Sequence, residues 1–73
     1  MNKYQAKIIL AFAENDMKIR PTAKQLYMSD CNVSYHLKKV RMQMGWNPFK
    51  FYDLCYLVGI AVQRIGRDDN GKA

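Results

Sequence analysis

The 73-residue sequence contains little cysteine and no long apolar segment. Its two cysteines, Cys31 and Cys55, are too few for the disulfide framework of a small secreted domain. The longest apolar run, residues 54–62, is far shorter than the roughly 20 residues that span a membrane. Lys3, Gln5 and Lys7 interrupt the N-terminal segment, so it lacks the apolar core of a signal peptide. These absences predict a cytoplasmic protein that does not enter a membrane.

Catalytic and metal-binding motifs are also missing from the sequence. It has no glycine-rich phosphate loop, no pair of carboxylates on a common face and no Ser-His-Asp set. One histidine and two separated cysteines do not make a zinc site. We therefore expect no enzymatic activity, no metal and no cofactor. His36 is expected to be a packed, partly buried imidazole, Cys55 a core residue and Cys31 an outward-pointing residue.

Negative charge is scarce in the middle of the chain. The protein has 12 Lys and Arg against 6 Asp and Glu, a net charge of +6. Between residues 18 and 50 the only acidic residue is Asp30, whereas seven are basic: Lys18, Arg20, Lys24, Lys38, Lys39, Arg41 and Lys50. This window carries the whole net charge, and the flanking segments are neutral. Such a basic segment suits a polyanion such as DNA; the alternative is a basic solvated surface without a ligand.

Helical periodicity predicts an all-α, four-helix domain over residues 1–66 and a polar, mobile C-terminal tail over residues 67–73. The first helix, residues 3–13, is expected to start at an Asn2–Gln5 capping box and to end at a left-handed Asn15. The second is expected to begin near Pro21, where Thr22 and Gln25 have capping-box spacing.

The third predicted helix has the clearest pattern. Ser29 is its expected N-cap, Gly45 ends it, and one stripe of residues faces inward: Val33, Leu37, Val40 and Met44. Trp46 and Phe49 are expected to fix the turn that follows.

The fourth predicted helix runs from about Pro48 to Ile65 and ends at Gly66. It is apolar on two faces. One face is expected to pack inward, namely Phe51, Leu54, Cys55, Val58, Val62 and Ile65. The other is expected to form a homodimer interface, namely Tyr52, Tyr56, Leu57 and Ile60.

A short helix, a tight turn and a longer basic helix form a helix-turn-helix, here without a wing. Ala23 stands where the two helices approach closely, and Tyr27 takes the place of the usual small turn residue. Residues 22–40, which read TAKQLYMSDCNVSYHLKKV, resemble the C-terminal helix-turn-helix of PucR-type transcriptional regulators and, more loosely, the Fis-type hairpin. The matching residues are Ala23, Leu26, Tyr27, Met28, Val33, Tyr35, Leu37, Val40, Gly45, Asp53 and Leu54.

This resemblance implies sequence-specific binding of double-stranded DNA, with the third helix in the major groove, by a transcriptional regulator. The outward side of that helix carries polar and basic residues that suit bases and phosphates. The predicted DNA contacts are Arg20, Lys24, Asn32, Ser34, Tyr35, Lys38 and Lys39. The alternative function is a protein-interaction module that docks a different chain on the apolar face of the fourth helix.

Overall fold

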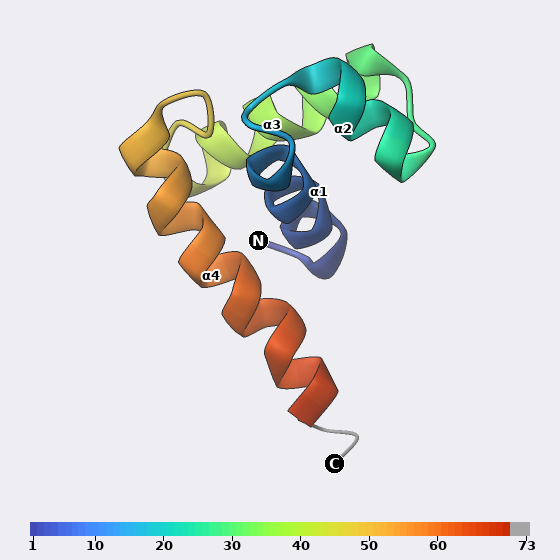
Figure 1. Ribbon diagram of the computed structural model, residues 1–73. Coiled ribbons are helices and arrows are strands. Elements are labelled where there is room, and N and C mark those ends of the chain that lie inside the picture. Colours follow the sequence, from blue (N-terminus) through green and yellow to red (C-terminus); the bar gives the residue numbers. More distant parts are fainter. Residues whose placement is uncertain (71–73) are drawn as a thin grey trace.

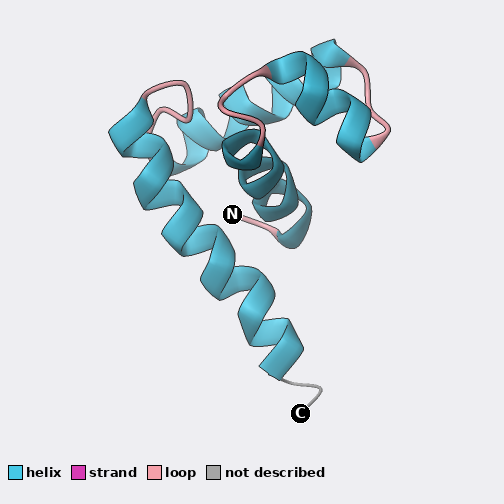
Figure 2. Cartoon of the chain, viewed as in Figure 1, coloured by secondary structure: helices cyan, strands magenta, loops and turns pink. Residues whose placement is uncertain are grey.

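The computed structural model describes residues 1–70, with side chains for residues 1–66. Within that part the chain forms α1 (Lys3–Glu14), α2 (Ile19–Leu26), α3 (Asp30–Met44) and α4 (Phe51–Asn70) (Figure 1). No β-strand occurs among the described residues (Figure 2). The prediction of an all-α domain with four helices is confirmed.

The helices pack around one small core. α1 and α4 lie against each other along most of α1, while α2 and α3 pack on α1 at the end of the molecule where α4 begins (Figure 1). The C-terminal part of α4 extends away from α2 and α3. The core draws on all four helices: Ala6, Ile8, Ile9, Phe12, Ala23, Val33, Leu37, Val40, Leu54, Leu57 and Ala61.

Both ends of α1 are held by asparagine side chains. Asn2 Oδ1 accepts from Gln5 N at 2.7 Å, and Asn2 N donates to Gln5 Oε1 at 3.1 Å, which confirms the predicted capping box. The left-handed residues at the far end are Asp16 (φ 56°) and Met17 (φ 62°), whereas Asn15 has a φ of −99°, so the prediction of a left-handed Asn15 is wrong. Asn15 Nδ2 instead donates to the Ala11 carbonyl at 2.7 Å. The reversal of the chain therefore comes one residue later.

The predicted start of α2 is also wrong. The helix begins at Ile19, and its N-cap, Lys18, makes no side-chain capping bond. Thr22 is buried inside the helix and donates from Oγ1 to the Lys18 carbonyl at 2.7 Å. Because the Thr22 hydroxyl is bonded to a carbonyl one turn earlier, it does not act as the N-cap of α2. Pro21 is tolerated because the first-turn N–H groups have no partner within the helix.

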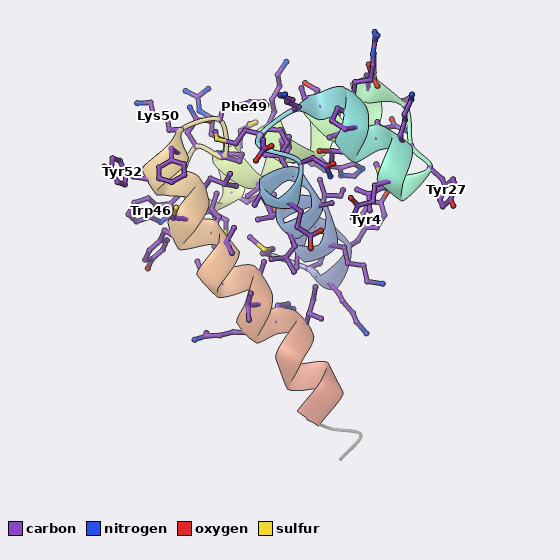
Figure 3. The ribbon with its side chains drawn as sticks, in the orientation of Figure 1. Tyr4, Tyr27, Trp46, Phe49, Lys50 and Tyr52 are labelled. Atoms are coloured by element: carbon purple, nitrogen blue, oxygen red, sulfur yellow. The ribbon has the colours of Figure 1, made fainter. Side chains whose placement is uncertain are left out.

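The turn from α2 to α3 ends α2 in a Schellman motif. Met28 N donates to the Ala23 carbonyl at 2.9 Å, and Tyr27 N donates to the Lys24 carbonyl at 3.3 Å. Tyr27 occupies the left-handed position with φ 56° and ψ 44°, where glycine is usual. Its side chain is 97% exposed and points away from the helices (Figure 3).

We therefore expect Tyr27→Gly to stabilise the protein. A left-handed conformation costs a non-glycine residue about 1–2 kcal/mol, and glycine's larger unfolded-state entropy offsets roughly half of that gain. The expected net effect is about 0.5–1 kcal/mol, or a rise of several degrees in the melting temperature. Thermal melting followed by circular dichroism measures it, with Tyr27→Ala as the control, because alanine keeps the strained backbone. A melting temperature for Tyr27→Gly at or below that of Tyr27→Ala would contradict this interpretation.

Helix α3 has the predicted boundaries. Ser29 Oγ accepts from Asn32 N at 3.1 Å, and Gly45 ends the helix with φ 77°. The aromatic residues after α3 hold the connection to α4. The Trp46 ring stacks on the Tyr56 ring with their centroids 4.3 Å apart, and the Phe49 ring meets the Phe12 ring edge-on with their centroids 5.7 Å apart. Their predicted role in this turn is confirmed.

Helix α4 is longer than predicted. It passes through Gly66 to Asn70, because one glycine inside a helix costs only about 1 kcal/mol and does not by itself end it. Residues 67–70 of the predicted tail thus continue α4, whereas residues 71–73 lie outside the described residues.

Helix α4 is also rotated from the predicted orientation. Leu57, expected at a dimer interface, is 0% exposed and packs in the core with Leu54 and Ala61. Three residues expected in the core are exposed instead, namely Phe51, Cys55 and Val62. The small Ala61 side chain lets α4 approach α1 closely along this stripe. Because α4 has apolar residues nearly all the way around, its sequence does not specify which stripe faces α1.

Candidate nucleic-acid interface

The outward side of α3 is left uncovered by the other helices. Val33, Leu37 and Val40 are buried on its inward side, so residues half a turn away from them project from the molecule. These outward residues are Cys31, Tyr35, Lys38, Lys39 and Met42, all exposed. A helix with this free side can enter a groove without moving its neighbours.

Tyr35 makes ring contacts on this outward surface. It is 54% exposed, and its ring meets the His36 ring edge-on, with the two ring centroids 5.3 Å apart. Tyr4 of α1 contacts His36 in the same way at 5.0 Å. The Nζ atom of Lys39 lies 5.6 Å from the centroid of the Tyr35 ring, a cation–π distance. An aromatic ring and an ammonium group are thus held side by side before any ligand arrives.

His36 is partly buried between the two tyrosines, as predicted. Its Nδ1 atom is buried without a hydrogen-bond partner among the described residues. Within that part of the chain no group of three His, Cys, Asp or Glu side chains could hold a metal ion.

The basic residues of α2 lie beside the start of α3. Arg20 and Lys24 are exposed and one helical turn apart, so they share one side of α2. Arg20 Nε lies 3.6 Å from Asp30 Oδ2 in the first turn of α3. This exposed ion pair crosses the helix-turn-helix and partly neutralises Arg20 where an anionic ligand would approach. The sequence did not reveal the pair, because it depends on where α2 begins.

The predicted contact residues do not form one continuous surface. Tyr35, Lys38 and Lys39 lie together on the outward side of α3. Asn32 and Ser34 stand on opposite edges of it, about 160° apart around the helix; Asn32 is exposed and Ser34 is half-buried. Cys31 and Met42, absent from the predicted contacts, occupy the centre of the surface. Their place follows from the same periodicity that buries Leu37.

The four residues predicted to form the dimer interface do not share one exposed surface. Tyr52 is 85% exposed and points away from the molecule (Figure 3), and Tyr56 is exposed on the same helix. Ile60 is half-buried, and Leu57 belongs to the core.

No helix in the described part of the chain is long and apolar enough to cross a membrane.

Comparisons with known proteins do not assign the chain to a family. No family model matches the sequence, and neither a curated protein nor a solved structure matches it. The case for a function therefore depends on the residues of the helix-turn-helix themselves.

Proposed function

We propose that this protein is a sequence-specific DNA-binding transcriptional regulator that inserts α3 into the major groove and acts as a homodimer. The observation that carries the proposal is the uncovered outward side of α3, where Tyr35, Lys38 and Lys39 stand together beside the basic side of α2. The cytoplasmic location expected from the sequence is part of this proposal.

Each part of this surface has a distinct role. The lysine ammonium groups bind phosphates and so set affinity without sequence preference. Tyr35, together with Cys31 and Asn32 near the start of α3, is placed to meet base edges or the thymine methyl group. A two-fold dimer presents two α3 helices about one turn of DNA apart, which doubles the number of contacts.

The salt dependence of DNA affinity tests this proposal. Five or six phosphate contacts predict that log K falls with log salt concentration at a slope near −5. Titration of a labelled duplex at several salt concentrations gives the slope. Failure to bind any duplex at low salt would refute the proposal.

A second candidate function is a protein-interaction module that uses α4. It is favoured by the exposed aromatic residues Phe51, Tyr52 and Tyr56 along one helix. DNA affinity decides between the two candidates, since docking through α4 does not use the basic residues.

Asp30 is expected to oppose DNA binding while stabilising the fold. Its carboxylate is exposed in the first turn of α3, engages Arg20 and repels phosphate. We expect Asp30→Asn to bind duplex DNA several-fold more tightly at low salt, because it removes one negative charge and frees Arg20. The variant should also lose about 0.3–1 kcal/mol of folding free energy, since the carboxylate interacts favourably with the helix dipole.

Duplex titration and urea unfolding measure the two effects of Asp30→Asn. Asp53→Asn is not a suitable control, because Asp53 caps the turn before α4 through a bond from Asn47 N. Glu14→Gln, on α1, removes one negative charge elsewhere. Equal gains in DNA affinity for Glu14→Gln and Asp30→Asn would show that only net charge matters.

A further inference from the structure

The outward side of α4 carries exposed apolar residues at the spacing of a coiled-coil seam. Tyr52, Cys55, Gly59 and Val62 are all exposed and follow one another at intervals of three, four and three residues. This is the a/d spacing that brings one side of a helix against another helix. We call these four residues the α4 seam.

We infer that the α4 seam is where two copies of this chain meet, with their α4 helices antiparallel. The inference deepens the proposed function, because it specifies how the homodimer in that proposal forms. It keeps Tyr52 from the interface expected from the sequence and replaces Tyr56, Leu57 and Ile60 with Cys55, Gly59 and Val62.

Charge favours a second copy of the chain as the occupant. The protein has a net charge of +6, concentrated in residues 18–50, so the surface formed by those residues repels another copy. The α4 seam has no charged residue, and the charged side chains within residues 51–66, Asp53 and Arg64, both lie on another side of the helix. An acidic partner would be drawn to the basic helices instead. An uncharged apolar seam is best matched by an identical one.

Gly59 is hard to explain within a single chain. It lies in the middle of α4, is exposed, and a Cβ atom built on it would meet nothing within 4 Å. Glycine destabilises a helix interior relative to alanine, and no contact among the described residues requires it here. A second helix that packs closely over Gly59 and Cys55 gives that glycine a function, because small residues let two backbones approach.

The side-chain sizes favour an antiparallel pair. With Cys55 opposite the partner's Gly59, Tyr52 falls opposite the partner's Val62, so each layer combines a larger with a smaller side chain. A parallel pair would place Tyr52 on Tyr52 and leave Gly59 facing Gly59. The parallel arrangement would also bring both basic α2–α3 regions together, since they lie near the start of α4 (Figure 1). The antiparallel arrangement separates them.

The seam is roughly 15 Å long, because Tyr52 and Val62 are ten steps of about 1.5 Å apart along the helix, and this is small for a stable interface. We therefore expect a dimer that dissociates in the micromolar range. Light scattering on a sizing column, or equilibrium sedimentation, measures this with the full chain and without DNA.

The decisive variant is Val62→Glu. Val62 is 53% exposed, so this variant should fold normally, but the dimer would bury an unpaired carboxylate. We expect the dimer dissociation constant to rise at least about 10-fold. The matched control is Arg64→Glu, two residues away on another side of α4. This variant should change the dimer dissociation constant by less than about 2-fold. Circular dichroism verifies that both variants keep their helices.

Disulfide cross-linking tests the orientation of the pair. In a Cys31→Ser background, antiparallel packing offsets the two Cys55 residues by about 6 Å along the helices, whereas Gly59→Cys places a thiol directly opposite the partner's Cys55. We expect oxidation to cross-link the Gly59→Cys protein at least about 10-fold faster than the protein with Cys55 alone. Similar rates would overturn the antiparallel orientation.

Three other results would overturn the inference. They are a wild-type protein that stays monomeric throughout the micromolar range, a Val62→Glu variant that dimerises like the wild type, and an Arg64→Glu variant that is as impaired as Val62→Glu. None of these results depends on DNA binding. A dimer that fails to bind DNA would instead refute the proposed function and leave this inference standing.

Discussion

The double variant Lys38→Glu, Lys39→Glu is expected to bind every DNA duplex at least about 100-fold more weakly than the wild type at low salt. Both lysines are exposed on the outward side of α3, and Lys39 is held over the Tyr35 ring. The substitutions remove two phosphate contacts and put two carboxylates against the DNA backbone. The loss should be similar for unrelated sequences, and fluorescence anisotropy with several labelled duplexes measures it.

A charge-matched control separates a local contact from overall attraction. Lys7→Glu with Arg64→Glu changes the net charge by the same amount, at exposed positions outside residues 18–50. Lys7 is on α1 and Arg64 is on α4, so neither belongs to the outward side of α3. We expect this control to weaken binding by less than about 10-fold. Equal losses in the two double variants would contradict a specific role for α3.

The variant Leu57→Ala is expected to remove much of the stability of the fold. Leu57 is fully buried between α4 and α1, and truncation of a buried leucine to alanine costs about 2–5 kcal/mol. A domain of this size has a folding free energy of roughly 4–11 kcal/mol, so a large part of it would be lost. Urea unfolding followed by circular dichroism measures the change.

The comparison variant for Leu57→Ala is Val62→Ala on the same helix. Val62 is exposed in the single chain, so its truncation should change the folding free energy of the monomer by less than about 0.5 kcal/mol. Both variants are measured at low protein concentration, where dimerisation does not contribute. If Leu57→Ala kept the wild-type stability but lost dimerisation, the orientation of α4 described above would be wrong.

The difference between α3 and α4 shows what the sequence could predict. In α3 one apolar stripe contrasts with mostly polar residues around the rest of the helix, so its inward side could be deduced before the structure. In α4 apolar residues occur nearly all the way around, and several orientations bury a similar apolar area. Which side faces α1 depends on shape, here on the fit of Leu54, Leu57 and Ala61, and periodicity does not contain that information.

The helix boundaries differ in the same way. Asn2 and Ser29 cap their helices as expected, because their side chains bond to amides within the same short segment. The Thr22 hydroxyl could either cap α2 or donate to a carbonyl one turn earlier, and it donates to the Lys18 carbonyl. The arrangement of Tyr4, His36 and Tyr35 and the Arg20–Asp30 pair each join two helices. These contacts could not be predicted before the helices were placed.

Protection of Cys31 from alkylation by bound DNA tests the central proposal most directly. Cys31 is exposed on the outward side of α3 near its N-terminal end. In a Cys55→Ser variant it is the only thiol, and mass spectrometry follows its reaction with a small alkylating reagent. With saturating duplex we expect this reaction to slow at least about 10-fold.

The control carries its only thiol on α1, outside the helix-turn-helix, through Lys7→Cys in a Cys31→Ser, Cys55→Ser background. Bound DNA is expected to leave the alkylation rate of this control unchanged while it protects Cys31. If Cys31 reacts as fast with saturating DNA as without it, α3 does not enter the groove and the proposed function is wrong.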